Sequence, residues 1–209
     1  MVHSMVKRRQ MDPDGKRASI MACGEKLFAA GGYTNTSMAD IAGAAGVAVG
    51  TLYRLFPDKP SLLGALHARM EDRFIAAMHF GWNQEQSLEN RFAPMVEALF
   101  VEAQKVKDIF PLYSMTRDAI GVTDYVPGHS MINAIEIQYR EGVEAGVFRD
   151  IPAGILGPMA HALVEGAFRA WMLEPNEIRM DLIKAELIAL FRLGFLVEKQ
   201  TGDIGSMGN

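Results

Sequence analysis

Apolar residues recur every three or four positions over most of the chain, and no run of strand length alternates apolar with polar positions. This pattern predicts an all-α protein. The first predicted helix carries Ile20, Cys23, Leu27 and Phe28 on one face. Paired glycines at 31–32 end it, because glycine adopts the left-handed conformation found at helix ends.

Two short helices are predicted next. Residues Ser37 to Asp40 have the capping-box pattern, in which a hydroxyl and a carboxylate three residues later satisfy backbone amides at a helix start. Gly46 ends this helix, and a further one predicted for residues 47–56 is ended by Pro57. Two short helices joined by a glycine-containing turn are typical of a helix-turn-helix unit.

The rest of the chain predicts longer helices, at residues 59–80, 87–106, 109–119, 130–146, 153–172 and 178–199. We therefore expect four parts along the chain. These are a tail at 1–15, a three-helix helix-turn-helix domain at 16–62, a larger helical domain at 63–200, and a second tail at 201–209.

Charge is divided unevenly along the chain. The net charge is −4 over 209 residues, but residues 1–60 hold eight Lys or Arg and five Asp or Glu, a net charge of +3. Contact with a polyanion is therefore expected near the N-terminus, where cations displace the counterions of phosphates. The sequence shows neither a secretory signal nor a stretch of about 18 apolar residues that would span a membrane, so we expect a cytoplasmic protein.

The sequence offers little for catalysis. A lone cysteine, Cys23, forms no internal disulfide, and is either a small buried hydrophobe or a redox-sensing thiol. The five histidines lack metal-ligand spacing, and the catalytic serine elbow, the phosphate-binding loop and the dinucleotide fingerprint are absent from the sequence. We predict no enzymatic activity, no metal and no cofactor.

The N-terminal domain also resembles a known family. The resemblance covers about 45 positions in register and rests on residues 28–33 (FAAGGY), 36–42 (TSMADIA) and 45–59 (AGVAVGTLYRLFPDK). These stretches are similar to the DNA-binding domain of TetR-family transcriptional regulators. The resemblance implies a regulator, expected to be a repressor, that binds a double-stranded DNA operator as a homodimer.

Candidate DNA contacts follow from this resemblance and from helix physics. Thr51 and Tyr53 resemble positions that touch phosphates or base edges, and Lys59 resembles a phosphate clamp. Ser37, at a helix N-terminus, is placed to bind a phosphate. Arg54 either reads a guanine or binds the DNA backbone.

The reading edge of the third helix departs from the family pattern. Many relatives have a hydroxyl residue followed by a polar or basic one where this chain has Ala48 and Val49, and His or Tyr where it has Leu55. The helix therefore loses a capping oxygen and a polar base reader, but Ala48 or Val49 can instead pack on a thymine methyl. Gly50 lies with Thr51, Tyr53 and Arg54 on the face that stays free. Direct readout is expected to be sparse, with DNA shape contributing more.

The last two predicted helices are apolar nearly all round, so each is expected to be buried on more than one side. A four-helix interface between two subunits fits this pattern, and the family dimerises in this way. The alternative is that both helices only close the core of the monomer. The predicted interface residues are Ala160, Val164, Phe168, Leu187, Leu190 and Phe191.

The remaining helices are expected to surround a pocket for a small, mostly apolar effector, as in the family's regulatory domains. Met and aromatic side chains with a few polar tips suit such a ligand, although the same residues equally fit an ordinary core. The predicted pocket residues are Met95, Phe110, Tyr113, Met115, His129, Tyr139, His161 and Trp171. The alternative function is a helical ligand- or partner-binding protein with weakened sequence-specific DNA readout.

Overall fold

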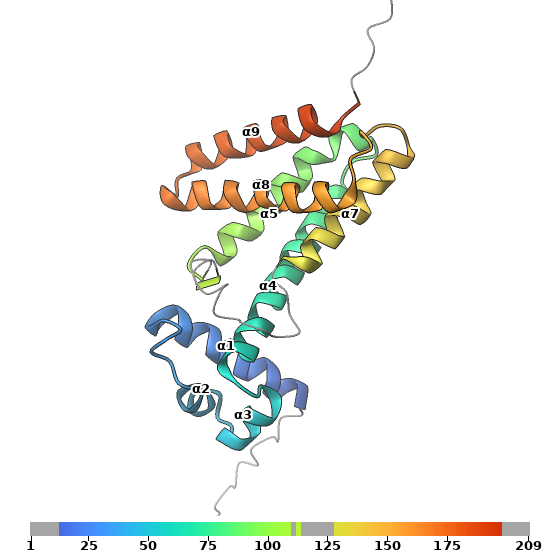
Figure 1. The fold of residues 1–209 in the computed structure, drawn as a ribbon. Helices are drawn as coiled ribbons and strands as arrows, with labels where there is room; N and C mark the ends of the chain where they lie inside the picture. Colours follow the sequence, from blue (N-terminus) through green and yellow to red (C-terminus); the bar gives the residue numbers. More distant parts are fainter. Residues whose placement is uncertain (1–12, 110–111, 114–127, 198–209) are drawn as a thin grey trace, which may run out of the picture. The chain divides into compact units, whose positions relative to one another are not determined.

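The computed structural model describes residues 13–109, 112–113 and 128–197, which form helices joined by short connections (Figure 1). Within these residues, β structure is limited to an isolated antiparallel bridge between Phe148 and Leu196. The predicted all-α fold is confirmed. The chain divides into two compact units: unit 1 comprises residues 1–70 and 106–127, and unit 2 comprises residues 71–105 and 128–209.

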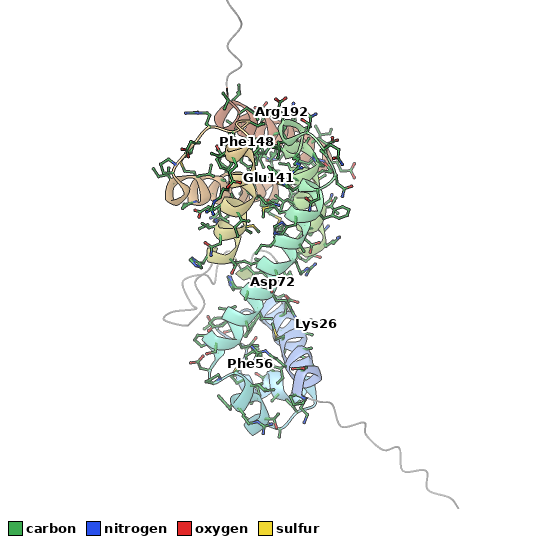
Figure 2. The ribbon with its side chains drawn as sticks, turned by 90° about the vertical axis from the view of Figure 1, so that its right-hand side faces the viewer. Lys26, Phe56, Asp72, Glu141, Phe148 and Arg192 are labelled. Atoms are coloured by element: carbon green, nitrogen blue, oxygen red, sulfur yellow. The ribbon has the colours of Figure 1, made fainter. Side chains whose placement is uncertain are left out.

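Unit 1 contains α1 (Pro13–Gly31), α2 (Met38–Ala45), α3 (Val49–Leu55) and the first part of α4 (Lys59–Trp82). The predicted domain boundary at residue 62 falls inside α4, a continuous helix whose residues are divided between the two units. One apolar core joins the helices of unit 1, and Figure 2 shows Phe56 between them. The largest fully buried side chains of this core are Ile20, Phe28, Ile41, Leu52, Phe56, Leu62, Leu63 and Leu66.

Unit 2 contains the rest of α4, the short 3-10 helix η1 (Leu88–Asn90), α5 (Phe92–Val106, up to residue 105), α7 (His129–Glu144), α8 (Ala153–Leu173) and α9 (Glu177–Phe195). Figure 1 shows α8 and α9 side by side. Rings from five segments pack with neighbouring centroids 5.1–6.2 Å apart, which suits offset and edge-to-face contacts. They belong to Trp82, Phe92, Tyr139, Phe148, Phe191 and Phe195.

Proline explains one difference from the predicted elements. The helix expected at 87–106 is divided into η1 and α5, which begins at Phe92. Pro94 then lies in the first turn of α5, where its missing N–H removes no helix hydrogen bond. Most of the helix expected at 109–119 lies outside the described residues, but Leu112 and Tyr113 are helical and buried in the core of unit 1.

Helices α4 and α5 approach each other closely at Gly81. A Cβ atom built on Gly81 would lie 2.6 Å from the Cα of Met95 and against the carbonyl oxygen of Pro94. These are backbone atoms, so no side-chain rotation would relieve the overlap. A residue without a side chain is therefore required at position 81.

Candidate nucleic-acid interface

The start of α2 is fixed by a complete capping box, as the sequence predicted. The Ser37 hydroxyl accepts from the Asp40 amide at 3.1 Å and donates to the Asp40 carboxylate at 2.6 Å, while the Ser37 amide donates to the same carboxylate at 3.0 Å. These bonds to Ser37 hold the pKa of the exposed Asp40 carboxyl below its ordinary value. A phosphate at this helix end would compete with Asp40 for the hydroxyl proton of Ser37.

The turn between α2 and α3 depends on Gly46. Its φ of 67° lies in the left-handed region, where glycine has no steric penalty. From this conformation the Gly46 amide donates to the carbonyl groups of Ala42 and Gly43, and the Val47 amide donates to that of Ala42. The turn thus ends α2 and redirects the chain into α3.

Helix α3 has one buried face and one exposed face. Leu52 is fully buried, and so is Phe56 just beyond the helix, in the core shared with α1 and α2. On the other side Tyr53 is 48% exposed, and Gly50 and Arg54 are exposed as well. A short helix with this division presents small and hydrogen-bonding groups to a major groove about 12 Å wide.

The N-terminus of α3 has the apolar character that the sequence predicted. Ala48 is the N-cap, and no side chain there makes a capping hydrogen bond. Val49 follows with 43% of its surface exposed, and Thr51 is half-buried. The first turn of α3 therefore offers methyl groups and backbone at the end where recognition helices of this type meet base edges.

Lys59, the predicted phosphate clamp, is engaged inside unit 1. Its ammonium donates to the carbonyl oxygens of Tyr33 at 2.9 Å, Thr36 at 3.1 Å and Thr34 at 3.3 Å, and lies 4.5 Å from the centre of the Tyr33 ring. Three carbonyls use all three donors of an ammonium group. Lys59 thus ties the connection between α1 and α2 to the start of α4, and a phosphate contact would replace one of these bonds.

Two polar residues, Thr36 and Arg17, stabilise this region, and the sequence analysis assigned no role to either of them. The buried Thr36 hydroxyl lies within hydrogen-bonding distance of the carbonyls of Leu27 and Gly32. Arg17 donates to the carbonyl oxygen of Leu55 at 3.2 Å, and its guanidinium lies 4.3 Å from the centre of the Phe56 ring. Thr36 and Arg17 contact backbone carbonyls, and Arg17 also contacts the ring of Phe56, which is distant in the sequence. Contacts of these kinds leave no pattern in the spacing of side chains along the sequence.

Replacing Ser37 with alanine is expected to destabilise the protein by about 1 kcal/mol at pH 7, the usual cost of losing a capping hydroxyl. The lowered pKa of Asp40 means that its contribution is present above the ordinary value of 3.8 and is lost as pH falls through the pKa of the folded state. The difference in free energy of unfolding between Ser37→Ala and wild type should therefore be smaller at acidic pH. Urea unfolding followed by circular dichroism at pH 7 and pH 3 measures it.

Ser87→Ala is a matched control for this experiment. Ser87 is the N-cap of η1, and its side chain makes no capping hydrogen bond. This variant should retain wild-type stability at both pH values. Equal losses for the two serine variants would contradict a specific role for the Ser37 capping box.

The residues predicted for the effector pocket do not form one group. Met95, Tyr139 and Trp171 are buried in unit 2, where the Tyr139 hydroxyl donates to the Arg149 carbonyl at 2.7 Å. Tyr113 is buried in unit 1, where it donates to Glu25. The four other predicted residues are His129, which is exposed, His161, which is half-buried, and Phe110 and Met115, which lie outside the described residues.

A groove of about 660 Å³ lies elsewhere in unit 2, along α4 and α5. Its lining combines small and apolar residues with charged ones, and none of the predicted pocket residues belongs to it. The lining residues are Arg73, Ala76, Ala77, Phe80, Gln84, Pro94, Glu97, Ala98, Val101, Glu102 and Lys105.

The residues predicted for the dimer interface mostly face the core of unit 2. Ala160, Phe168, Leu187 and Phe191 are buried, and Val164 is half-buried, which leaves Leu190 as the exposed member at 51%. A different apolar face of α8 and α9 is exposed. Its large members are Ile155, Met159, Leu163 and Leu173 of α8, and Ile178, Leu182, Leu190 and Leu193 of α9.

Within the described residues, no cluster of three or more His, Cys, Asp or Glu is arranged to hold a metal ion. The described helices include none whose length and apolar character would let it cross a membrane. Cys23 is partly buried against the core of unit 1.

The family-model match to known proteins lies in unit 1. Residues 20–66 match the family model for bacterial regulatory proteins of the tetR family. This range contains α2, the turn at Gly46, α3 and the start of α4. No curated protein matches the chain.

Solved structures with the same fold extend over both units. A candidate tetR-family transcription regulator of Shewanella sp. PV-4 is 24% identical, with a TM-score of 0.73, over 88% of this chain and 99% of that one. A candidate regulator of the same family from Syntrophomonas wolfei is 20% identical, with a TM-score of 0.73, over 90% of this chain and 100% of that one. The fatty acid degradation regulator FadR of Bacillus halodurans is 19% identical, with a TM-score of 0.63, over 85% of this chain and 94% of that one.

Proposed function

We propose that this chain, whose N-terminal part is a TetR-family helix-turn-helix DNA-binding domain, is a transcriptional repressor that binds a double-stranded operator as a homodimer. The observation that carries the proposal is the exposed face of α3. Gly50, Tyr53 and Arg54 lie on this face, while Leu52 on the opposite face holds the helix in the core. The face matches the size and chemistry of a major groove.

The proposed contacts divide by chemistry. Tyr53 and Thr51 carry hydroxyls that donate to phosphates or base edges, and Arg54 provides a guanidinium for a guanine or a phosphate. Ala48 and Val49 place methyl groups where a thymine methyl would lie. Ser37 and Lys59 contribute chiefly by fixing α2 and the connection before it, because their polar groups have partners within unit 1.

Gly50→Glu is expected to raise the Kd for operator DNA at least about tenfold, since it brings a carboxylate to the phosphates. Nothing lies within 4 Å of a Cβ atom built on Gly50, and a glutamate in the first turn of a helix is favourable, so folding should be preserved. Fluorescence anisotropy with promoter DNA flanking the protein's own gene, at several salt concentrations, measures the effect.

Gln104→Glu in unit 2 adds the same charge at an exposed position of α5 and is expected to bind like wild type. Gly50→Ala separates the effect of charge from that of added bulk. Sequence-preferring binding that weakens with salt in the wild type is required by the proposal. Undiminished binding by Gly50→Glu would argue against α3 as the DNA-reading helix.

The dimer is proposed to form through the exposed apolar face of α8 and α9. A bipartite operator requires two recognition helices about 34–36 Å apart, or a multiple of that distance, which a two-fold dimer provides. Ile178 and Leu193 are 78% and 82% exposed, and contiguous exposed apolar surface of this kind typically marks a protein interface.

A small, mostly apolar effector is proposed to bind in unit 2 and to release the operator. The groove along α4 and α5 has a volume within the usual range for small-molecule sites, and its lining contains both apolar and charged side chains. The Bacillus halodurans protein of the same fold is a regulator of fatty acid degradation, which fits an apolar ligand class. Repeating the DNA titration with candidate compounds, together with thermal unfolding, tests this part of the proposal.

One observation favours the alternative of a helical ligand- or partner-binding protein. The reading edge of α3 is apolar at Ala48 and Val49, which leaves few side chains for direct base readout. Binding that depends on salt but shows no preference among DNA sequences would support this alternative.

A further inference from the structure

Three of the four charged residues that line the groove along α4 and α5 gather at one of its ends. Arg73 of α4 donates from Nε to the Glu102 carboxylate of α5 at 2.7 Å. Eight residues further along α4, Gly81 lies against Pro94, which precedes Glu102 by eight residues on α5, so the two helices are antiparallel. Lys105, which pairs with Glu102 at 3.1 Å, therefore lies at the Arg73 end, and Pro94 lies at the other.

The Arg73 end of the groove carries one positive charge in excess. Glu102 is buried, at 7% exposure, and its single carboxylate accepts from both Arg73 and Lys105. The fourth charged residue of the lining, Glu97, accepts at 2.8 Å from Lys184, which lies outside the groove. Both carboxylates thus have cationic partners, whereas the two cations share one carboxylate. An anion bound at this end would complete the pairing.

Both cations keep hydrogen-bond donors for a ligand. Arg73 uses Nε for Glu102, and its Nη1 and Nη2 groups have no other partner within the described residues. These two groups form the edge of a guanidinium that binds a carboxylate through two parallel hydrogen bonds. Lys105 uses one of its three ammonium donors on Glu102. The two side chains are 40% and 59% exposed, so a ligand has access to them.

Beyond the charged end the lining is mostly small or apolar. It includes the alanines at positions 76, 77 and 98, which take up little space, and Val101 and Phe80, which are 42% and 67% exposed. Covering such exposed apolar surface with an apolar ligand is favourable. The lining extends from residue 73 to 84 on α4 and from 94 to 105 on α5, which corresponds to about 16 Å of α-helix.

We propose that the effector is an unbranched apolar carboxylate, whose head group binds Arg73 and Lys105 and whose chain lies along the alanines toward Pro94. This inference rests on the proposed function, in which the groove is the effector site. A neutral compound would leave the excess charge unpaired, and an apolar cation would be repelled. An extended chain advances about 1.2 Å per bond, as an extended backbone does, so about 12 carbons match the length of the groove.

The test is a calorimetric titration of the protein without DNA, using decanoate, 1-decanol and decylammonium below their micelle concentrations. The three probes share one alkyl chain that fits within the groove, and they differ in the charge of the head group. Wild type should bind decanoate at least about tenfold more tightly than either of the others, because hydrogen bonds between charged groups are the stronger kind.

Two variants separate the head group from the chain. Arg73→Gln should remove the preference for decanoate over 1-decanol, and Lys105 remains to pair the buried Glu102, so folding should be preserved. Phe80→Ala should weaken the binding of both probes by a similar factor of about five, because it removes apolar contact alone. Arg140→Gln, at an exposed position of α7 outside the groove, is the matched control and should keep the wild-type preference.

The carboxylate site is wrong if wild type does not bind decanoate, binds 1-decanol or decylammonium as tightly, or keeps its preference in Arg73→Gln. The proposed function fails separately, in anisotropy measurements with operator DNA. If decanoate binds through Arg73 but leaves the Kd for operator unchanged, or if wild type shows no sequence-preferring DNA binding, the carboxylate site stands and the regulatory role does not.

Discussion

Replacing Leu182 and Leu193 with glutamate is expected to convert the protein to a monomer and to weaken operator binding by about 100-fold or more. Both leucines lie on α9 and are 63% and 82% exposed. They are 11 residues apart, which places them on the same side of the helix. Two carboxylates on each subunit would be brought together in a two-fold interface, where burial of unpaired charge is strongly unfavourable.

The loss of affinity follows from the loss of the second half-site. A dimer bound at one half-site presents its other recognition helix at a high effective concentration, which typically raises affinity by factors of about 100 to 10,000. A monomer has only the affinity of one α3 for one half-site. Sedimentation equilibrium gives the oligomeric state, and anisotropy with full and half operators gives the affinity.

Ile137→Glu combined with Gln104→Glu is a suitable control. Both residues are exposed in unit 2, Ile137 at 66%, and they belong to α7 and α5 rather than to α8 or α9. The control is expected to remain dimeric and to bind the operator. A dimeric Leu182→Glu, Leu193→Glu protein would require another interface.

Gly81→Ala is expected to destabilise the protein by about 3 kcal/mol, the upper part of the usual range for overpacking. The new methyl group would overlap the Pro94 carbonyl and lie 2.6 Å from the Cα of Met95, so α4 and α5 must separate. Separation would also loosen the buried contacts of Trp82 with the Phe92 ring, 5.7 Å away between centroids. Urea unfolding followed by circular dichroism measures the loss.

Gly154→Ala provides the comparison. Gly154 lies in the first turn of α8, and nothing lies within 4 Å of a Cβ atom built there. This change should leave the free energy of unfolding at the wild-type value or raise it by about 0.5 kcal/mol, because alanine restricts the conformations of the unfolded chain. If Gly81→Ala were as stable as Gly154→Ala, the close approach of α4 and α5 would be refuted.

The helix-turn-helix was predictable because its signals are local. The Ser37 and Asp40 pair, the glycine at 46 and the proline at 57 each fix a helix end by chemistry within a few residues. The uncapped start of α3 was equally visible, because Ala48 has no side-chain oxygen. These features appear in the structure where the sequence predicted them.

The roles that depend on distant partners were not predictable in the same way. The carbonyl partners of Lys59 lie 23 to 26 residues earlier in the chain, and three backbone oxygens leave no mark on side-chain spacing. Tyr113 likewise looked like a residue of the larger domain, but the chain returns there to unit 1. Only tertiary structure brings such pairs together.

The last two helices show where periodicity fails. When a helix is apolar nearly all round, its sequence does not reveal which face meets the core of its own subunit. Phe168 and Phe191 are buried within unit 2, while Leu182 and Leu193 remain exposed. Both helices have apolar residues on two sides, and most of the predicted interface residues lie on the side that faces the core of unit 2.

The distribution of aromatic residues has a spectroscopic consequence. The chain has two tryptophans, and both Trp82 and Trp171 lie in unit 2, each 4% exposed. Intrinsic tryptophan emission therefore reports on unit 2 alone, whereas far-ultraviolet circular dichroism averages over every helix. A mismatch between the two signals during denaturation would show that the DNA-binding unit melts as a separate cooperative block.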